Sequence, residues 1–357
     1  MIVKKICMIV PSFEAKGGIA SVVRGYRGSE LEQKYQVRYI EAYCDGGKVK
    51  KLWKAGCAYL LFLWTLLTFR PDLIHIHSAF GASFYRKAPF IYIGAMLHIP
   101  VVNHIHGSDL ERFYWGKSAH HKAFIRSTYR KCSKILVLSE RWKDRFRELI
   151  DSNKMEVIVN YGTLQNHRCE DEKKESHMVL FMGFLSELKG CYDIPKVAAL
   201  VARRLQYVRF VLAGSGSAGD IQQIKAMTKN CGVEERLAFP GWVRGKEKDV
   251  LLRQADLFFL PSYTEGMPMS ILEAMAYGLP VVSTTVGGIP ELVEHEKSGF
   301  LLEPGDTEGF AEAIITLLKD PRKRTEMGQT GKAFVQENYS LEKHINSLMN
   351  VYDSLIR

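Results

Sequence analysis

The sequence has 357 residues, 46% of them hydrophobic, with 12 prolines and 29 glycines spread along it, which predicts two domains with sizeable cores. The seven cysteines show no metal-site pair spacing and the opening MIVKKICMIVPSF shows no secretory signal, so we expect reduced thiols in the cytosol. The excess of basic residues lies in residues 1–150, which contain 25 Lys and Arg and 11 Asp and Glu. This asymmetry indicates either ordinary solvated basic helices or a first domain that binds a nucleic acid, an acidic membrane or a phosphorylated substrate.

Apolar strand-like runs alternate with longer helical stretches along the chain. The first series is KICMIVP, QVRYIEA, PDLIHIHS, IPVVNHIHG, KILVLS and MEVIVNYG, and the second is MVLFMGFL, VRFVLAGS, RLAFPGW, ADLFFLPS and GLPVVSTT. Such runs predict two parallel sheets covered on both faces. The charged stretch CEDEKKES, 169–176, is a candidate linker between two doubly wound domains that face a cleft, with ligands at the carboxyl ends of the strands.

Two segments of the first series bear on membranes. The run AGCAYLLFLWTLLTF, 55–69, is uncharged but shorter than the roughly 20 residues of a bilayer span, so it predicts a helix that leads into the next strand, with a surface-docked helix as the alternative. Residues 111–147 mix aromatic with basic side chains, and Lys122, Arg126 and Arg130 would share one helical face. That face suits anionic headgroups, or it is simply solvated.

Glycine-containing loops follow the first strand of each series. Gly17 and Gly18 precede a helix and would let backbone N–H groups approach an anion. In VLFMGFLSELKG, Gly183 lies in the strand-like run and Lys189 lies in the loop after it. Lys189 is either an ordinary surface lysine or a cation that binds a phosphate group.

Two further patterns suggest other functions. Gly214, Gly216 and Gly219 have dinucleotide-fingerprint spacing, but Glu234, the acidic residue at the right distance, precedes a strand instead of ending one, which argues against a nicotinamide enzyme. The HIH pairs His75/His77 and His104/His106 each lie on one strand face, as in some metal sites, yet no third and fourth ligand with comparable placement is evident.

The stretch PSYTEGMPMSILEAMAYGLPVVSTTVGGIPELV, with FPGW before it and SGFLLEPGD after it, resembles the retaining nucleotide-sugar glycosyltransferases of family 4. Its E-x7-E motif is Glu265 and Glu273, and the Gly17–Gly18 loop, HGSD at 106–109, VIVNYG, the Lys189 loop and the closing helix all fall in family order. The resemblance covers essentially the whole chain. It implies the α/β GT-B fold, with an acceptor domain at 1–170, a nucleotide-sugar domain at 171–339, and a C-terminal helix at about 340–357 that packs back on the first domain.

The resemblance also implies roles for single residues. Glu265 would bind the hydroxyls of the donor sugar beside the amides of Gly266, Met267, Pro268 and Met269. Glu273 would bind the ribose, Lys189 the diphosphate and His106 the transferred sugar. Gly17, Gly18 and Gly183 belong to the phosphate loops, and Trp242 and Val243 would contact the base.

One departure from the family pattern follows Gly183, where Phe184 stands in place of the usual basic residue. The resemblance implies no metal or other cofactor, because fixed cations and helix dipoles stabilise the leaving diphosphate. We therefore expect a metal-independent retaining hexosyltransferase that uses a nucleotide sugar, with UDP as the expected base, and a lipid-linked saccharide acceptor in cell-surface polysaccharide synthesis. It would be peripheral on the inner face of the cell membrane and bind no nucleic acid. The alternatives are a soluble sugar synthase with a small or phosphorylated acceptor, and a catalytically silent binding subunit of a glycan-assembly complex.

Overall fold

The computed structural model describes residues 3–163 and 177–356. The chain forms two compact units, one of residues 1–160 and 341–357 and the other of residues 161–340. The predicted boundary at 170/171 and the linker at 169–176 lie outside the described residues. The division of the chain falls ten residues earlier than that boundary, at Asn160/Tyr161.

The first unit is a parallel sheet with the strand order β2-β1-β3-β4-β5-β6. Its inner strands are rich in Val, Ile and Leu and are buried on both faces, as expected when helices cover a parallel sheet, whereas the edge strands are only partly buried. They are β1 (Lys5–Val10), β2 (Gln36–Glu41), β3 (Leu73–Ser78), β4 (Val101–Ile105), β5 (Lys134–Val137) and β6 (Met155–Val157). All six were expected from the sequence.

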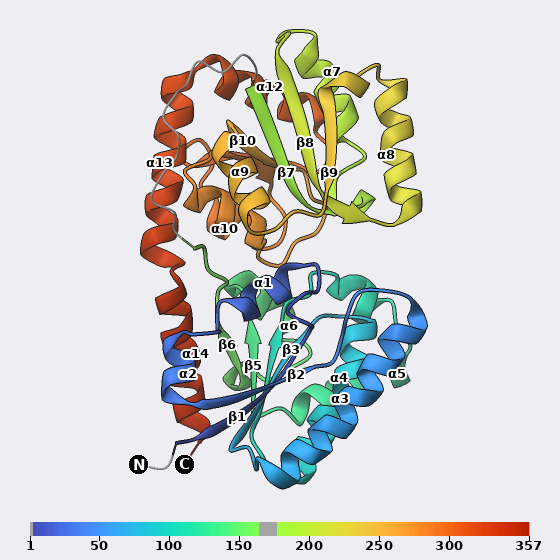
Figure 1. The fold of residues 1–357 in the computed structure, drawn as a ribbon, viewed down its shortest axis with the longest axis vertical. Coiled ribbons are helices and arrows are strands. Elements are labelled where there is room, and N and C mark those ends of the chain that lie inside the picture. The colour runs from blue at the N-terminus through green and yellow to red at the C-terminus, as the bar shows by residue number, and fades with distance from the viewer. Residues whose placement is uncertain (1–2, 164–176, 357) are drawn as a thin grey trace. The chain divides into compact units, whose positions relative to one another are not determined.

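Helices flank both faces of this sheet (Figure 1). One apolar core joins strand residues such as Ile74 and Ile76 to Phe62, Phe90 and Tyr129 of helices on one face. The helices of the unit are α1 (Gly18–Arg24), α2 (Glu30–Lys34), α3 (Lys48–Thr68), α4 (Ala82–Met96), α5 (Ala119–Arg130), α6 (Glu140–Phe146) and α14 (Leu341–Leu355), with a π-helical turn at Glu111–Trp115 and a 3₁₀ turn at Ser152–Lys154. The predicted helix in 55–69 is confirmed as part of α3.

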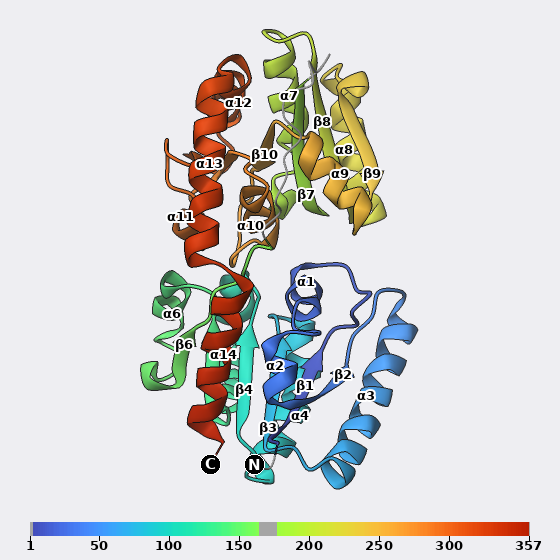
Figure 2. The same cartoon turned by 60° about the vertical axis from the view of Figure 1, so that its left-hand side comes forward.

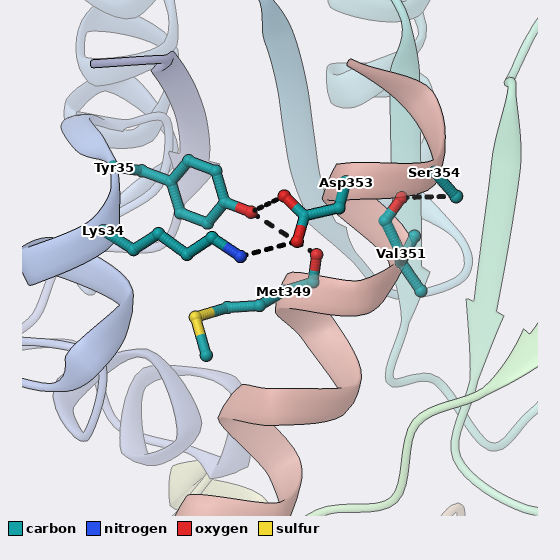
Figure 3. Close-up of polar contacts among 6 residues, drawn as sticks. All are labelled: Lys34, Tyr35, Met349, Val351, Asp353 and Ser354. Atoms are coloured by element: carbon teal, nitrogen blue, oxygen red, sulfur yellow. Dashed lines mark hydrogen bonds and ion pairs between the residues drawn. The ribbon is translucent and has the colours of Figure 1, made fainter. Parts of the chain in front are cut away.

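Helix α14 belongs to the first unit although it follows the whole of the second in sequence. Asp353 accepts hydrogen bonds from Lys34 Nζ at 2.5 Å and from Tyr35 Oη at 2.6 Å, which ties α14 to the end of α2 (Figure 3). The buried face of α14 carries His344, Ile345, Leu348, Val351 and Tyr352.

The second unit repeats the architecture with the order β12-β11-β10-β7-β8-β9, again all parallel. Its strands are β7 (His177–Leu185), β8 (Val208–Gly216), β9 (Leu237–Gly241), β10 (Leu257–Leu260), β11 (Val281–Thr284) and β12 (Gly299–Leu302). Five were expected, whereas β12, GFLL, was not singled out as a strand. The expected α/β fold with two doubly wound sheets is therefore confirmed.

The helices of the second unit lie on both faces of its sheet (Figure 2). They are α7 (Ile194–Ala202), α8 (Ala218–Asn230), α9 (Lys246–Gln254), α10 (Met269–Ala276), α11 (Ile289–Leu292), α12 (Thr307–Lys319) and α13 (Pro321–Asn338), with 3₁₀ turns at Glu187–Lys189 and Glu234–Arg236. Across residues 3–163 and 177–356, no helix combines the length and apolarity needed to cross a bilayer.

Candidate active site

Lys189 is placed by a tight turn after β7. The 3₁₀ turn Glu187–Lys189 ends at Gly190, whose φ of 68° lies in the left-handed region that glycine adopts without strain. A Cβ at Gly190 would lie 1.9 Å from the carbonyl oxygen of Pro261, so only glycine lets the turn approach the backbone after β10 this closely. The turn therefore holds Lys189 beside the loop that carries Glu265.

Lys189 and Glu265 form an ion pair. The Nζ atom of Lys189 lies 2.6 Å from Oε1 of Glu265 and donates to the carbonyl oxygen of Thr264 at 3.4 Å. Ser262 Oγ donates to the same carboxylate oxygen at 2.9 Å. Glu265 is only 7% exposed, whereas about a quarter of the Lys189 side chain remains accessible. The carboxylate is thus fixed by two donors while the ammonium group can still meet an anion.

The loop around Glu265 is hydrogen-bonded to the last residue of β11 and to the segment that follows β11. Gly288 N–H donates to the Gly266 carbonyl at 2.8 Å, and Thr284 Oγ1 donates to that of Ser262 at 2.7 Å. A Cβ at Gly287 would lie 1.9 Å from the Glu265 carbonyl oxygen, and its φ of 58° also favours glycine. Such support fixes the loop before any ligand binds.

Helix α10 starts at Met269, directly after the buried Met267 and Pro268. No side chain of the described residues caps its amino end, so the positive end of the helix dipole is available to an anion. Glu273 lies on this helix, and its Oε1 atom is 2.8 Å from Lys248 Nζ of α9.

Lys248 was missed in the sequence analysis. It lies in the first turn of α9, where the helix dipole disfavours a cation, and that unfavourable position is the signal that could have identified it. The ion pair fixes the carboxylate of Glu273, which is 18% exposed, in one orientation.

The other predicted donor residues lie at the same edge of the second sheet. Gly183 is in β7 opposite Gly214 of β8, where a Cβ on Gly214 would lie 1.9 Å from the Gly183 carbonyl oxygen. Trp242 and Val243 directly follow β9 and are half-buried, and the side chain of Phe184 is half exposed. Because all strands are parallel, the segments after β7, β9 and β10 gather at one edge.

The remaining predicted residues, Gly17, Gly18 and His106, lie in the first unit. Gly17 precedes α1 with a φ of 125°, and the space that its missing side chain would fill is open within 4 Å. His106 follows β4, and its Nε2 atom lies 2.9 Å from Nδ1 of His77, so one of these nitrogens donates and the other accepts. Burial lowers the pKa of His106 to about 3, with a further contribution from His344, so the ring is neutral at physiological pH.

Both HIH pairs belong to one buried histidine cluster. The β3–β4 register sets His104 opposite His77, and ring nitrogens of His75, His77 and His104 lie within 4.8 Å of one another. A third nitrogen ligand is therefore present, contrary to the expectation from sequence. Among the described residues, Nε2 of His75 and of His77 have no hydrogen-bond partner. The three rings could hold a metal ion, or they could remain neutral imidazoles, because burial lowers the pKa of all three well below the usual range.

A pocket of about 470 Å³ starts at the residue after His106. It is lined by the ends of β3 and β4, the start of α4 and the π-helical turn, and it combines aromatic with charged side chains. Its polar residues include Ser108, Asp109, Arg112 and Lys117, and its aromatic residues are Phe80, Tyr85 and Phe113. A hydroxylated ligand with an anionic group matches this lining.

The structure therefore groups the predicted residues in two sets. Lys189, Glu265, Glu273 and the 266–269 backbone lie together in the second unit, and Gly17, Gly18 and His106 lie at the carboxyl edge of the first.

Comparison with known proteins covers most of the chain. Residues 15–161 match the family described as Glycosyltransferase Family 4, and residues 164–334 match Glycosyl transferases group 1. The chain is 28% identical to N-acetyl-alpha-D-glucosaminyl L-malate synthase of Bacillus anthracis, over 80% of this chain and 75% of the relative. It is 25% identical to the putative teichuronic acid biosynthesis glycosyltransferase TuaC of Bacillus subtilis, over 80% of this chain and 72% of that protein. The crystal structure of Anabaena Alr3699/HepE in complex with UDP and glucose superposes with a TM-score of 0.75 at 21% identity, covering 98% of this chain and all of that one.

Proposed function

The chain belongs to the family 4 glycosyltransferases and has the GT-B fold, and from this premise we propose that it transfers a hexose from UDP-sugar to a lipid-linked saccharide acceptor, with retention at the anomeric carbon. The product would enter cell-surface polysaccharide synthesis at the inner face of the cell membrane. The observation that carries the proposal is the Lys189–Glu265 ion pair, which lies on a loop that hydrogen bonds from Thr284 and Gly288 hold in place.

Lys189 would stabilise the leaving diphosphate. Its ammonium group is a point charge that can turn from Glu265 to phosphate oxygens, and the uncapped amino end of α10 adds a second positive field. Charge that develops on the leaving group is then met by groups fixed in advance, so the proposed reaction needs no bound metal. No other cofactor takes part, because the nucleotide sugar is itself a substrate.

Glu265 would bind and orient the donor sugar. Once Lys189 turns to the diphosphate, the carboxylate can accept hydrogen bonds from sugar hydroxyls, with Ser262 still holding one of its oxygens. Backbone groups of Gly266, Met267 and Met269 would lie along the sugar, whereas Pro268 supplies shape but no N–H donor.

Glu273 would accept hydrogen bonds from the vicinal hydroxyls of the ribose. Lys248 would act as a positioning residue that holds the carboxylate in place at 2.8 Å. Trp242 and Val243 would contact the base, and Gly183 would let the chain pass close to the nucleotide. We propose UDP because the Anabaena protein of the same fold was crystallised with it.

In the first unit, neutral His106 would contact the transferred sugar, and Gly17 and Gly18 would approach the phosphates through their backbone. Retention would follow a front-face route, in which the departing phosphate accepts the proton of the acceptor hydroxyl as the new glycosidic bond forms. The side chain of Glu265 then orients the sugar and forms no covalent intermediate.

The acceptor would occupy the pocket beside His106. Arg112 and Lys117 are suited to an anionic group of the acceptor, and Tyr85 and Phe113 to the apolar face of a sugar ring. A lipid diphosphate carrier supplies such an anionic group, and the basic excess in residues 1–150 agrees with it.

One specific observation favours a second candidate. The Bacillus anthracis relative is named N-acetyl-alpha-D-glucosaminyl L-malate synthase, a name that includes the small anion L-malate, and the pocket has room for such a molecule beside Arg112 and Lys117. A soluble synthase with a small or phosphorylated acceptor is therefore the alternative function. The Lys189–Glu265 and Lys248–Glu273 pairs argue against a catalytically silent subunit, since both sets of charges are in place.

The test measures donor hydrolysis with a panel of UDP-, GDP- and ADP-sugars, then transfer from the best donor to a lipid-diphosphate-linked saccharide and to small anionic acceptors. We expect hydrolysis of a UDP-hexose and preferred transfer to the lipid-linked acceptor. Faster transfer to a small acceptor would replace the proposal with the soluble synthase. Binding without turnover of any donor would establish the silent subunit.

A further inference from the structure

Helix α3 exposes apolar side chains on the face that points away from the core. It has 21 residues, a length of about 31 Å, and it buries Ala55, Ala58, Phe62 and Thr65. On its exposed side, Leu52, Trp53, Leu60, Trp64 and Leu67 are 61 to 75% exposed. A surface helix normally turns polar residues to water, so this second apolar face is unusual and is not buried by the packing of the first unit.

The exposed apolar side chains form one continuous surface, which we call the α3 stripe. Val49, Trp53, Leu60, Trp64 and Leu67 follow each other at spacings of three, four or seven residues and so share one side of the helix. No charged residue occurs between Lys54 and Arg70. The stripe is therefore uninterrupted over about four turns.

Cations lie at both ends of the stripe. Lys48, Lys50, Lys51 and Lys54 occupy the first two turns, and Arg70 follows the helix, whereas α3 contains no acidic residue. Lys54 pairs with Glu41, while Lys48 and Lys50 are exposed to water. Apolar side chains with tryptophans among them, bordered by lysines, match a bilayer interface with anionic headgroups.

We propose that α3 is the element by which this protein docks on an anionic lipid surface, with the stripe inserted at the level of the headgroups. A second copy of the chain fits the stripe less well. In a symmetric pair of α3 helices, the lysines of one copy would face either the lysines or Arg70 of the other, and α3 offers no acidic residue to match them.

The place of α3 in the first unit agrees with this inference. Its first turn follows the carboxyl end of β2, the same sheet edge at which β4 leads into His106. Figures 1 and 2 show α3 on the outer side of the unit, beyond β2 and alongside α4. The docking deepens the proposed function and rests on it for its purpose, since a lipid-linked acceptor would be presented at that surface.

The α5 face suggested by the sequence is less suited to docking. On that face, Lys122 lies over the rings of Tyr114 and Trp115. One of the three basic residues of that face, Lys122, is therefore already in contact with aromatic rings of its own unit.

The experiment is flotation of the full chain with vesicles of phosphatidylcholine, with and without phosphatidylglycerol. We expect flotation with the anionic vesicles, and a loss of about tenfold or more in Leu60→Glu/Trp64→Glu, because two large apolar side chains are replaced by anions. The matched control is Tyr207→Glu/Val250→Glu, at exposed apolar positions of the second unit, which should float like the parent. Flotation of the α3 variant at the parent level would overturn the proposal.

A second pair of variants tests the charges. Lys48→Gln/Lys50→Gln should weaken binding to anionic vesicles by about fivefold per lysine and leave binding to neutral vesicles unchanged. The solution mass of the parent, measured by light scattering, completes the test. A dimer that Leu60→Glu/Trp64→Glu breaks, without flotation of either protein, would make a second copy the occupant and overturn docking on lipid.

Flotation needs no acceptor, so its outcome is separable from that of the proposed function. Docking by α3 together with transfer only to a soluble acceptor would leave this inference standing and remove the lipid-linked acceptor. Transfer to a lipid-linked acceptor in detergent, without flotation of the parent, would do the reverse.

Discussion

The Nζ atom of Lys189 lies 2.6 Å from Oε1 of Glu265, across two loops joined by the close approach of Gly190 to Pro261. The cation and the carboxylate neutralise each other while no donor is bound. In the proposed function, a sugar diphosphate would offer new partners to both, phosphate oxygens to Lys189 and hydroxyl groups to Glu265. The ion pair therefore holds the two charged groups of the proposed site next to each other.

Lys189→Ala should lower turnover by about 100-fold or more, because a fixed cation no longer meets the charge that develops on the leaving diphosphate. Single-turnover transfer rates measure the effect. Lys229→Ala, on the exposed side of α8, is the matched control and should keep the parental rate. A parental rate in Lys189→Ala would contradict the assignment.

Glu265→Ala should chiefly slow transfer and change UDP affinity little, because the carboxylate is proposed to contact the sugar and not the nucleotide. Loss of one charge-assisted hydrogen bond costs about 2 kcal/mol, roughly 30-fold in rate. The kinetics are compared with UDP titrations of the same variant. A fall in UDP affinity as large as the fall in rate would move Glu265 to the nucleotide.

Glu273→Ala should weaken UDP binding by about 2 kcal/mol, since the ribose loses a charged acceptor. Lys248→Ala should weaken it less, by about 1 kcal/mol, because the carboxylate remains but is no longer oriented by Lys248. Calorimetry measures both, with Glu247→Ala on the exposed side of α9 as control. Unchanged affinity in Glu273→Ala would remove the ribose assignment.

Activity should survive dialysis against EDTA, because the proposed site uses protein cations in place of a metal ion. Elemental analysis of the purified protein gives an independent readout for His75, His77 and His104. Loss of turnover that manganese or zinc restores would contradict the prediction, and zinc that is lost in His104→Leu would assign it to the histidine cluster.

Stability should fall as the pH drops below about 6.5. Burial lowers the pKa of His344 to about 4 and that of His106 to about 3, while histidines of the unfolded chain take up protons near 6.5. Between these values the unfolded state binds more protons, so the stabilisation present above pH 6.5 is lost on acidification, by up to about 1.4 kcal/mol per pH unit and histidine.

Urea unfolding at several pH values measures this slope. His344→Gln should reduce it, because glutamine can meet polar neighbours without titrating, whereas the exposed His120→Gln should leave it unchanged. A slope that is the same in all three proteins would exclude His344 as a source.

The sequence predicted the sheets better than the contacts between side chains. Eleven strands were recognisable chiefly because buried parallel strands are continuous apolar runs, whereas GFLL of β12 lies inside the SGFLLEPGD motif and forms an edge strand that is mostly only partly buried. The partnership of Lys248 with Glu273 depends on how α9 packs near α10, and that of His104 with His77 on the β3–β4 register. Neither the packing of helices nor the register of strands can be predicted from the spacing of neighbouring residues in the sequence.

The histidine cluster also shows how far motif reading extends. Alternation along a strand correctly placed His75 with His77 on one face. It could not show that Tyr352 of the distant α14 would lie 2.5 Å from Nδ1 of His75. This contact depends on the packing of the C-terminal helix α14 in the first unit.

The return of α14 has a consequence for biosynthesis. The ribosome makes β1 to β6 first, yet the side chains that cover His75 and Tyr26, Tyr352 and His344, are translated only after the entire second unit. The first unit therefore emerges without the helix that covers these side chains, and its packing can be completed only after the second unit has been translated. Nascent chains arrested before Leu341 should accordingly bind chaperones through their oldest segment, not their newest.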